Sequence, residues 1–285
     1  MTEELYSGIL RRDGQRAWIA DEAGDIILEP TVIWQGYLKH WTNQNVHARF
    51  LPQRDYENRE PILIMWPREP VPDNAFVEFY FNERLVKYPA SFFGHNAINV
   101  NGHIYNFSHL INENEIMAPE EYFYRPALGE FAPSPDTGKF EIKDDGRAYF
   151  DKFGRNFMRT IHVLRIYGMD TEQLSAILNH ELEIIHATPP HPARPEKYPD
   201  FSFFNRSCST IIRDAFRRLG YTQIAGVLPR DLFVNTAFHL RRESALDTRF
   251  FLRPQLMVEE APPSALAPLM NPRNRIRFRS LKVNI

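Results

Sequence analysis

Apolar and polar residues alternate in short runs along the first third of the chain, which is the pattern of half-buried β-strands. Turn-forming pairs such as Asp13-Gly14 separate these runs. The predicted strands cover residues 6–10, 17–20, 25–28, 61–66 and 76–81. We therefore expect residues 1–88 to form a small, β-rich, barrel-like domain, and its role is not indicated by any residue in it.

A further strand signal covers residues 91–100 and leads directly into Asn101-Gly102. Asn-Gly between two apolar runs is the strongest short-range signal for a two-residue hairpin turn. Residues 103–108 should therefore return beside the first strand. Paired residues share a face of a sheet, as do residues two apart on one strand. This register predicts that His95 and Asn106 lie diagonally beside each other.

Apolar residues at spacings of three and four predict helices in the second half of the chain. The first helix, at residues 149–166, rests on Phe153, Phe157, Ile161 and Leu164. The second, at residues 170–186, opens with Asp170 and Gln173 in a capping arrangement. The third begins at Cys208 and ends before Gly220, a residue that favours the C-terminal end of a helix.

These elements predict an α+β fold in which helices pack on an antiparallel sheet. We expect three regions: the β-rich domain at residues 1–88, a domain at 89–252, and a proline-rich tail at 253–285. Alternating residues at 276–283 predict that the tail ends in a strand.

Composition and charge limit the partners that the chain would bind. Its 285 residues carry a formal net charge of −2 and no evident basic face, which argues against nucleic acid as a partner. The acidic start, MTEELYSGILRRDGQ, is not a secretory signal, and no apolar run is long enough to span a bilayer. We expect a soluble protein that is made in the cytoplasm.

The chain has a single cysteine, Cys208, so an internal disulfide and a cysteine-based zinc cluster are excluded. The start of a helix stabilises a thiolate, because free N–H groups and the positive end of the helix dipole meet there. A thiol nucleophile needs a base, and the base needs an orienting group. His95 is the predicted base and Asn106 the predicted orienting group. Ser108, His103 and His109 are alternatives to Asn106, and the structural alternative is that Cys208 is simply a small buried residue.

Three residues just before Cys208 are predicted to bind substrate: Phe203, Phe204 and Asn205. The phenylalanines could equally belong to the core. His180, Glu181 and His186 suggest a metal site at first sight, but the two histidines are six positions apart rather than the four that place two ligands on one helical face. A solvated helix face is the better interpretation, so we predict neither metal nor cofactor.

Two stretches resemble a known enzyme family. FGHNAI at residues 93–98, followed by YNF at 105–107, is similar to the histidine strand pair of circularly permuted papain-like (NlpC-type) enzymes. FFNRSCSTIIRD at residues 203–214 resembles their cysteine helix start, and PRDLF at 229–233 resembles a segment that follows it. Between these motifs, GR at residues 154–155, Leu164 and TEQL at 171–174 resemble the intervening helices of one branch of the family. That branch contains the bacterial lipoprotein N-acyltransferases. Unlike many relatives, this chain has two residues between Asn205 and Cys208, and it lacks the membrane spans of that branch.

The resemblance implies a permuted papain-like domain that works through a Cys-His-polar triad and an acyl-enzyme. The expected substrate is an acyl ester or amide, with a phospholipid or other acyl lipid favoured. The first alternative is a peptidase or amidase that cuts peptidoglycan stem peptides or host proteins. The second is a binding module without turnover. A chain of this kind would suit a bacterial effector exported by a signal-independent route, with a secretion machine or an immunity protein as partner.

Overall fold

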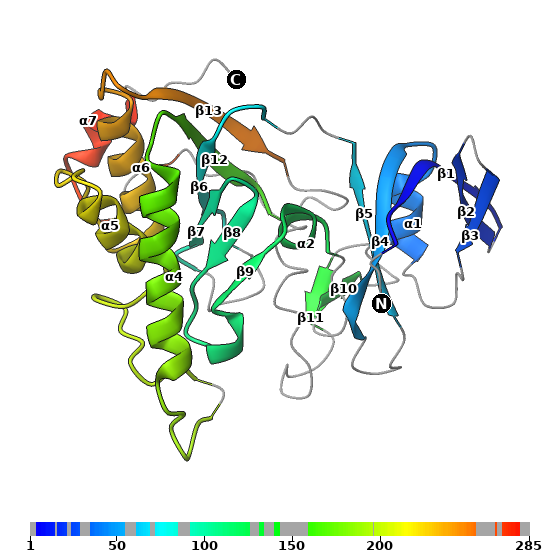
Figure 1. Cartoon of the computed structure of the whole chain (residues 1–285), viewed down its shortest axis with the longest axis horizontal. Coiled ribbons are helices and arrows are strands. Elements are labelled where there is room, and N and C mark those ends of the chain that lie inside the picture. Colours follow the sequence, from blue (N-terminus) through cyan, green and yellow to red (C-terminus); the bar gives the residue numbers. More distant parts are fainter. Residues whose placement is uncertain are drawn as a thin grey trace. The chain divides into compact units, whose positions relative to one another are not determined.

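The computed structural model describes residues 4–14, 16–21, 24–28, 35–54, 61–68, 72–84, 92–125, 131–133, 140–142, 159–195, 197–254, 266 and 270–279. The chain divides into two compact units, each assembled from segments that are separate in sequence (Figure 1). The first unit comprises Met1–Val71, Pro119–Met158 and Gln255–Glu260. The second comprises Pro72–Ala118, Arg159–Pro254 and Ala261–Ile285.

The first unit contains a five-stranded antiparallel sheet in the order β3-β2-β1-β4-β5. Its elements are β1 (Tyr6–Asp13), β2 (Arg16–Asp21), β3 (Gly24–Leu28), α1 (Gln35–Trp41), β4 (Asn45–Arg54) and β5 (Pro61–Pro67). The helix α2 (Pro119–Tyr124) and the short pair β10 (Phe131–Pro133) and β11 (Phe140–Ile142) also belong to this unit. The four predicted strands of this region are confirmed, whereas α1, β4 and α2 were not predicted.

Helix α2 is tied to the first unit by buried polar contacts. The Tyr37 hydroxyl on α1 is hydrogen-bonded to the Tyr124 carbonyl at 2.8 Å. Arg49 on β4 forms ion pairs with Glu120 at 3.0 Å and with Glu121 at 2.7 Å. A segment from the middle of the chain therefore completes the core of the N-terminal unit.

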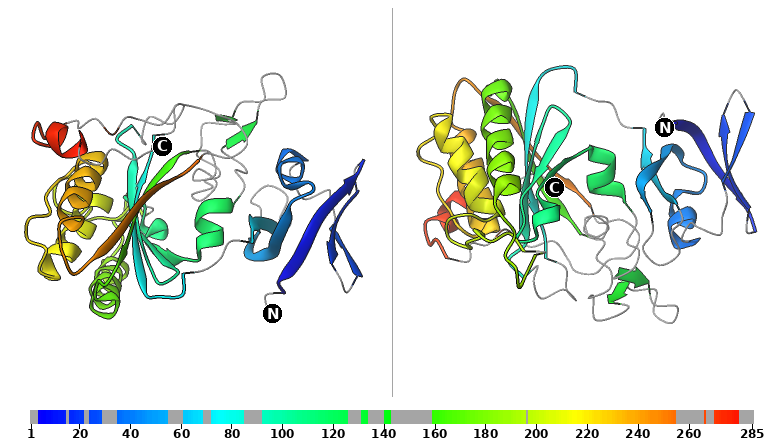
Figure 2. Two further views of the ribbon diagram at one scale, coloured as in Figure 1. Left: turned by 90° about the horizontal axis from the view of Figure 1, so that it is seen from above. Right: turned by 60° about the horizontal axis from the view of Figure 1, so that its bottom comes forward.

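The second unit is built on a six-stranded sheet in the order β13-β12-β6-β7-β8-β9, and every neighbouring pair is antiparallel. The strands are β6 (Phe76–Asn82), β7 (His95–Val100), β8 (His103–Asn106), β9 (Glu115–Met117), β12 (Ile161–Tyr167) and β13 (Asp247–Arg253). The helices are η3 (Ile111–Glu113), α4 (Thr171–Ala187), α5 (Cys208–Arg218), α6 (Pro229–Leu240) and α7 (Asn274–Arg279). Helices α4, α5 and α6 cover one face of the sheet (Figure 2).

The hydrophobic core of this unit lies between that sheet face and the three helices. Phe79 on β6 packs against Phe216 on α5 and Phe233 on α6, at ring-centroid distances of 5.6 and 5.5 Å, and all three rings are fully buried. The predicted cap of α4 is confirmed, because the Asp170 carboxylate accepts a hydrogen bond from the Gln173 N–H. The predicted α+β class with antiparallel sheets is thus confirmed. Within the described residues, no helix is both long enough and apolar enough to cross a bilayer.

Two predicted elements are wrong. Ile161 and Leu164, assigned to a helix at residues 149–166, lie in β12, which is paired on both sides and buried on both faces. A continuously buried strand has apolar residues at every position, so it also satisfies a helical spacing. Residues 149–158 lie outside the described part. Residues 276–279 belong to α7 rather than to a strand, and residues 280–283 lie outside the described part.

The predicted domain boundary at residue 88 also differs from the division seen in the structure. Strand β6, which the prediction assigned to the N-terminal domain, is a central strand of the six-stranded sheet and pairs with both β12 and β7. Residues 119–158 fall inside the predicted second domain but belong to the first unit. Local pattern identified these strands, but it could not show which partner each strand would choose.

Candidate active site

The β7–β8 hairpin brings His95 and Asn106 together as the sequence predicted. Ala97 pairs with Asn106, and both Asn101 and Gly102 have the positive φ that the two-residue turn requires (52° and 90°). His95 Nε2 and Asn106 Oδ1 are 2.6 Å apart. Gly94 directly precedes β7; its φ is 77°, and a Cβ there would lie 2.5 Å from the Phe81 ring. Only glycine fits this turn into the strand, and the turn places His95 at the strand end.

The protonation of His95 follows from the contacts of Asn106. The Asn106 Nδ2 donates to the Glu113 carbonyl oxygen at 2.7 Å, so Oδ1 is the atom that faces the histidine. Because Oδ1 can only accept, it receives the proton of His95 Nε2. The neutral imidazole therefore keeps Nδ1 unprotonated. That nitrogen is the one available to a thiol.

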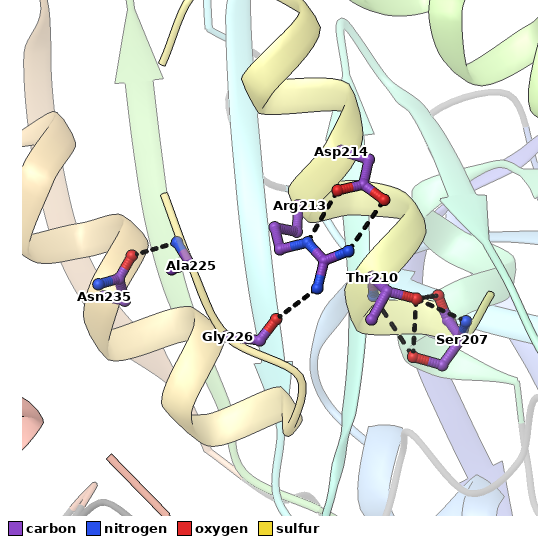
Figure 3. Close-up of polar contacts among 7 residues, drawn as sticks. All are labelled: Ser207, Thr210, Arg213, Asp214, Ala225, Gly226 and Asn235. Atoms are coloured by element: carbon purple, nitrogen blue, oxygen red, sulfur yellow. Dashed lines mark hydrogen bonds and ion pairs between the residues drawn. The ribbon is translucent and has the colours of Figure 1, made fainter. Parts of the chain in front are cut away.

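Cys208 is the first residue of α5, and the helix start is held by a capping box. Ser207 Oγ accepts a hydrogen bond from the Thr210 N–H, and Thr210 Oγ1 accepts one from the Ser207 N–H (Figure 3). Both capping residues are buried, whereas Cys208 itself is partly exposed. The N–H groups of Cys208 and Ser209 also belong to the first turn, where the helix itself supplies no backbone acceptor. The prediction of a thiol at a helix start is confirmed.

A second set of contacts fixes α5 against the segment that leads to α6. Arg213 pairs with the Asp214 carboxylate at 2.8 Å, and its Nη1 donates to the Gly226 carbonyl (Figure 3). The preceding residue, Ala225, donates its N–H to Asn235 Oδ1 on α6 at 2.6 Å. Arg213 and Asp214 thus have a structural role, because their contacts hold α5, the helix that begins at Cys208, against the segment before α6.

Electrostatics couple Cys208 to His95. Burial raises the pKa of the Cys208 thiol, but the charge of His95 and a hydrogen bond with that ring outweigh burial and bring the pKa from 9.0 to about 7. The Asn96 backbone and the Ser209 hydroxyl lower it further. Burial lowers the pKa of His95, but the charge of Cys208 and the same hydrogen bond raise it overall, against the opposing charge of Arg159. Each group therefore favours the charged form of the other.

A buried hydrogen bond that the sequence did not predict joins the two halves of the site. Ser209 Oγ donates to Asn96 Oδ1 at 2.9 Å, and Asn96 Nδ2 donates to the Tyr80 carbonyl at 2.9 Å. Ser209 and Asn96 are both fully buried. Since each follows directly after Cys208 or His95, this bond sets the separation of the thiol and the ring. Their position next to the two predicted residues is the signal that could have identified them.

The alternative orienting residues have other contacts. Ser108 Oγ donates to the Glu113 carboxylate, and the His109 ring packs against Phe201 at 5.9 Å. His103 is exposed at the turn end of the hairpin. Asn114 Oδ1 accepts a hydrogen bond from the Ser108 N–H and so closes the loop between these two residues. The Glu113 carbonyl, which accepts from Asn106, lies in this closed loop.

The predicted substrate-binding residues separate into two groups. Phe203 joins an exposed aromatic cluster formed by Phe92, Phe93, Phe203 and Phe204, whose neighbouring ring centroids are 5.2 to 5.6 Å apart. Phe204 is 63% exposed and Phe92 is 54% exposed, so these rings are not core residues. Within the described residues, no hydrogen bond joins the Asn205 side chain to His95, Asn106 or Cys208.

The histidines and glutamate of α4 do not converge. His180 faces Glu183, Glu181 is buried between Arg206 and Arg218, and His186 donates to the Asn114 carbonyl. No group of three or more potential metal ligands occurs in the described part of the chain. The buried Glu181 instead anchors α4 to Arg206, close in sequence to Cys208.

Comparison with known proteins returned no relative. No protein-family model matches the chain, and no curated protein and no solved structure resembles it significantly.

Proposed function

We propose that this protein is a cysteine-dependent hydrolase or acyltransferase that works through an acyl-enzyme on Cys208. The observation that carries the proposal is the arrangement Cys208–His95–Asn106, in which a thiol of lowered pKa faces an imidazole held by an amide oxygen. The resemblance of the histidine and cysteine motifs to permuted papain-like enzymes supports the same assignment. We extend the proposal to the fold, as a permuted papain-like domain formed by the second unit.

The chemistry follows from the protonation states. The Cys208 thiolate attacks the carbonyl carbon of an ester or amide, and the oxygen of the tetrahedral intermediate lies near the N–H groups at the start of α5. As the intermediate collapses, the His95 imidazolium gives its Nδ1 proton to the departing oxygen or nitrogen. Asn106 keeps the ring oriented throughout by accepting from Nε2.

The second half of the cycle reverses these roles. Neutral His95 removes a proton from water or from an amine, and the resulting nucleophile attacks the thioester carbonyl. The thiolate departs and pairs again with the imidazolium. Water yields a free acid, whereas an amine yields a new amide.

The exposed aromatic cluster favours acyl lipids over peptides as substrates. Phe93 lies two residues before His95 and Phe203 lies five before Cys208, so the rings and the triad share the same two segments. Aromatic side chains with exposed faces offer apolar contact to an acyl chain. We therefore place a lipid ester first among the substrates, with delivery as a bacterial effector as the corresponding biological setting.

The test uses the single cysteine of the chain. The full-length protein is incubated with phospholipid vesicles and, separately, with purified peptidoglycan, and intact mass spectrometry records any acyl adduct. Because Cys208 is the only cysteine, a thioester adduct that hydroxylamine removes can be assigned to it. Cys208→Ala and Cys208→Ser are the controls.

Free fatty acid and an acyl adduct on the native protein alone would support the proposal. Released stem peptides would identify an amidase instead. If neither substrate is turned over and Cys208 titrates as an ordinary thiol, the protein is a binding module and the proposal is wrong.

A further inference from the structure

A basic pocket lies in the second unit where the segment after Asn106 meets the segment before Cys208. Its volume is about 610 Å³, within the range of small-molecule sites. The lining includes His109, which lies three residues beyond Asn106, and Phe201, which lies seven residues before Cys208. The pocket is therefore bounded by continuations of the two segments that carry the proposed triad.

The basic side chains of the pocket are arranged by consecutive turns. The Arg194 N–H donates to the His191 carbonyl at 3.0 Å, and the Lys197 N–H donates to the Arg194 carbonyl at 3.1 Å. The three basic residues His191, Arg194 and Lys197 consequently recur at every third position. Prolines on either side of Arg194 restrict the backbone of these turns.

Backbone contacts fasten these turns to the segment that follows Asn106. The Tyr198 N–H donates to the His109 carbonyl at 2.9 Å, and Lys197 forms a β-bridge with Leu110. Tyr198 is a buried wall of the pocket, and its hydroxyl accepts a hydrogen bond from Arg206. Backbone hydrogen bonds thus hold the wall of the pocket, and the basic side chains project from this wall with exposed surfaces.

Two cations line the pocket. Among the described residues, its lining contains Arg194 and Lys197 but no acidic residue. Neither of these two cations forms an ion pair with another residue in the part of the chain that the structure describes. His191 Nδ1 accepts the Ala193 N–H, so a proton on the neutral ring sits on Nε2, which can act as a donor.

We propose that this pocket binds the phosphate group of an anionic substrate and thereby positions its acyl ester for Cys208. The inference rests on the proposed function for the role of the bound substrate, whereas the anion site stands on its own geometry. Guanidinium, ammonium and imidazole donors are the groups that bind phosphate oxygens in proteins. The phosphate could belong to a lipid head group or to a soluble phosphate ester.

The test measures binding in the Cys208→Ala background, so that turnover does not enter. Inorganic phosphate and glycerol phosphate are titrated calorimetrically, and phosphatidylglycerol vesicles are assayed by flotation. The pocket variant is Arg194→Gln with Lys197→Gln. The matched control is Arg273→Gln with Arg275→Gln, which removes the same charge from two exposed residues outside the pocket lining.

We expect the pocket variant to weaken binding about tenfold or more, while the control stays within about twofold of the parent. Loss confined to vesicles would identify a lipid phosphate, and loss with the soluble phosphates alone would identify a soluble ester. Either result supports the site. Equal binding by parent and pocket variant, or an equal loss in the control, would overturn it. If phosphate binding depends on the pocket but no acyl adduct ever forms on Cys208, the anion site remains and the proposed chemistry fails.

Discussion

Replacing His95 by asparagine should return Cys208 to the behaviour of an ordinary or even less acidic thiol. The charge of His95 and its hydrogen bond hold the thiol pKa at about 7, whereas burial acts in the opposite direction. Without the ring, burial remains, and the pKa should rise to 9.0 or above. A change of this size corresponds to roughly 2 to 3 kcal/mol of thiolate stabilisation.

The measurement is the rate of iodoacetamide alkylation against pH, with the sole cysteine as the only thiol. A thiol of pKa 7 is about one tenth ionised at pH 6, and one of pKa 9 about one thousandth. The more basic thiolate is intrinsically about eightfold more nucleophilic, since the Brønsted coefficient is about 0.4 to 0.5. We therefore expect alkylation of His95→Asn at pH 6 to be about tenfold slower, and its midpoint to move upward by about two pH units.

His103→Asn is the matched control, because His103 lies exposed on the same hairpin. It should leave both rate and midpoint unchanged. If His95→Asn and the native protein share one midpoint, the imidazole does not stabilise the thiolate and the reasoning is refuted. Near-ultraviolet circular dichroism of each variant verifies that the fold is retained.

Three further substitutions test the scaffold of the site, each by urea unfolding. Gly94→Ala should lower the free energy of unfolding by about 1 to 3 kcal/mol, because a Cβ would lie 2.5 Å from the Phe81 ring at a φ of 77°; an unchanged midpoint would show that the turn can relax. Ser207→Ala removes the cap on the Thr210 N–H and should cost about 1 kcal/mol, and a neutral effect would mean that the capping box does not contribute. Asn106→Leu should cost about 1 to 3 kcal/mol, since it removes the hydrogen bonds of the buried Asn106 to the Glu113 carbonyl and to His95. It should also slow any acyl transfer at least tenfold or so through loss of the ring orientation, and full activity would exclude Asn106 as the orienting residue.

Local sequence signals predicted the hairpin and the start of α5, because both elements depend on the backbone preferences of a few neighbouring residues. Asn101-Gly102 supplies two positive φ angles, and the register of His95 with Asn106 follows from that turn alone. Gly220, with a φ of 98°, likewise ends α5 where the sequence placed the stop. Such signals do not depend on distant partners.

The remaining parts of the site depend on partners that are distant in sequence. The Ser209–Asn96 bond joins residues 113 positions apart; each adjoins a predicted site residue, but only the folded unit shows that the two are bonded to each other. Strand β12 was misread because its apolar content reflects burial by two neighbouring strands rather than an amphipathic face. Orientation of Asn106 by the Glu113 carbonyl requires the loop closed by Asn114, which exists only in the folded unit.

The placement of α2 has a consequence for biosynthesis. Its Glu120, Glu121 and Tyr124 meet Arg49 and Tyr37, which leave the ribosome some seventy to ninety residues earlier. The N-terminal strands are therefore translated before α2, and their buried polar groups can contact α2 only after residues 119–124 have been made. A polypeptide that ended after residue 88 would lack the Glu120 and Glu121 partners of the buried Arg49, so the N-terminal unit depends on a segment that is translated later.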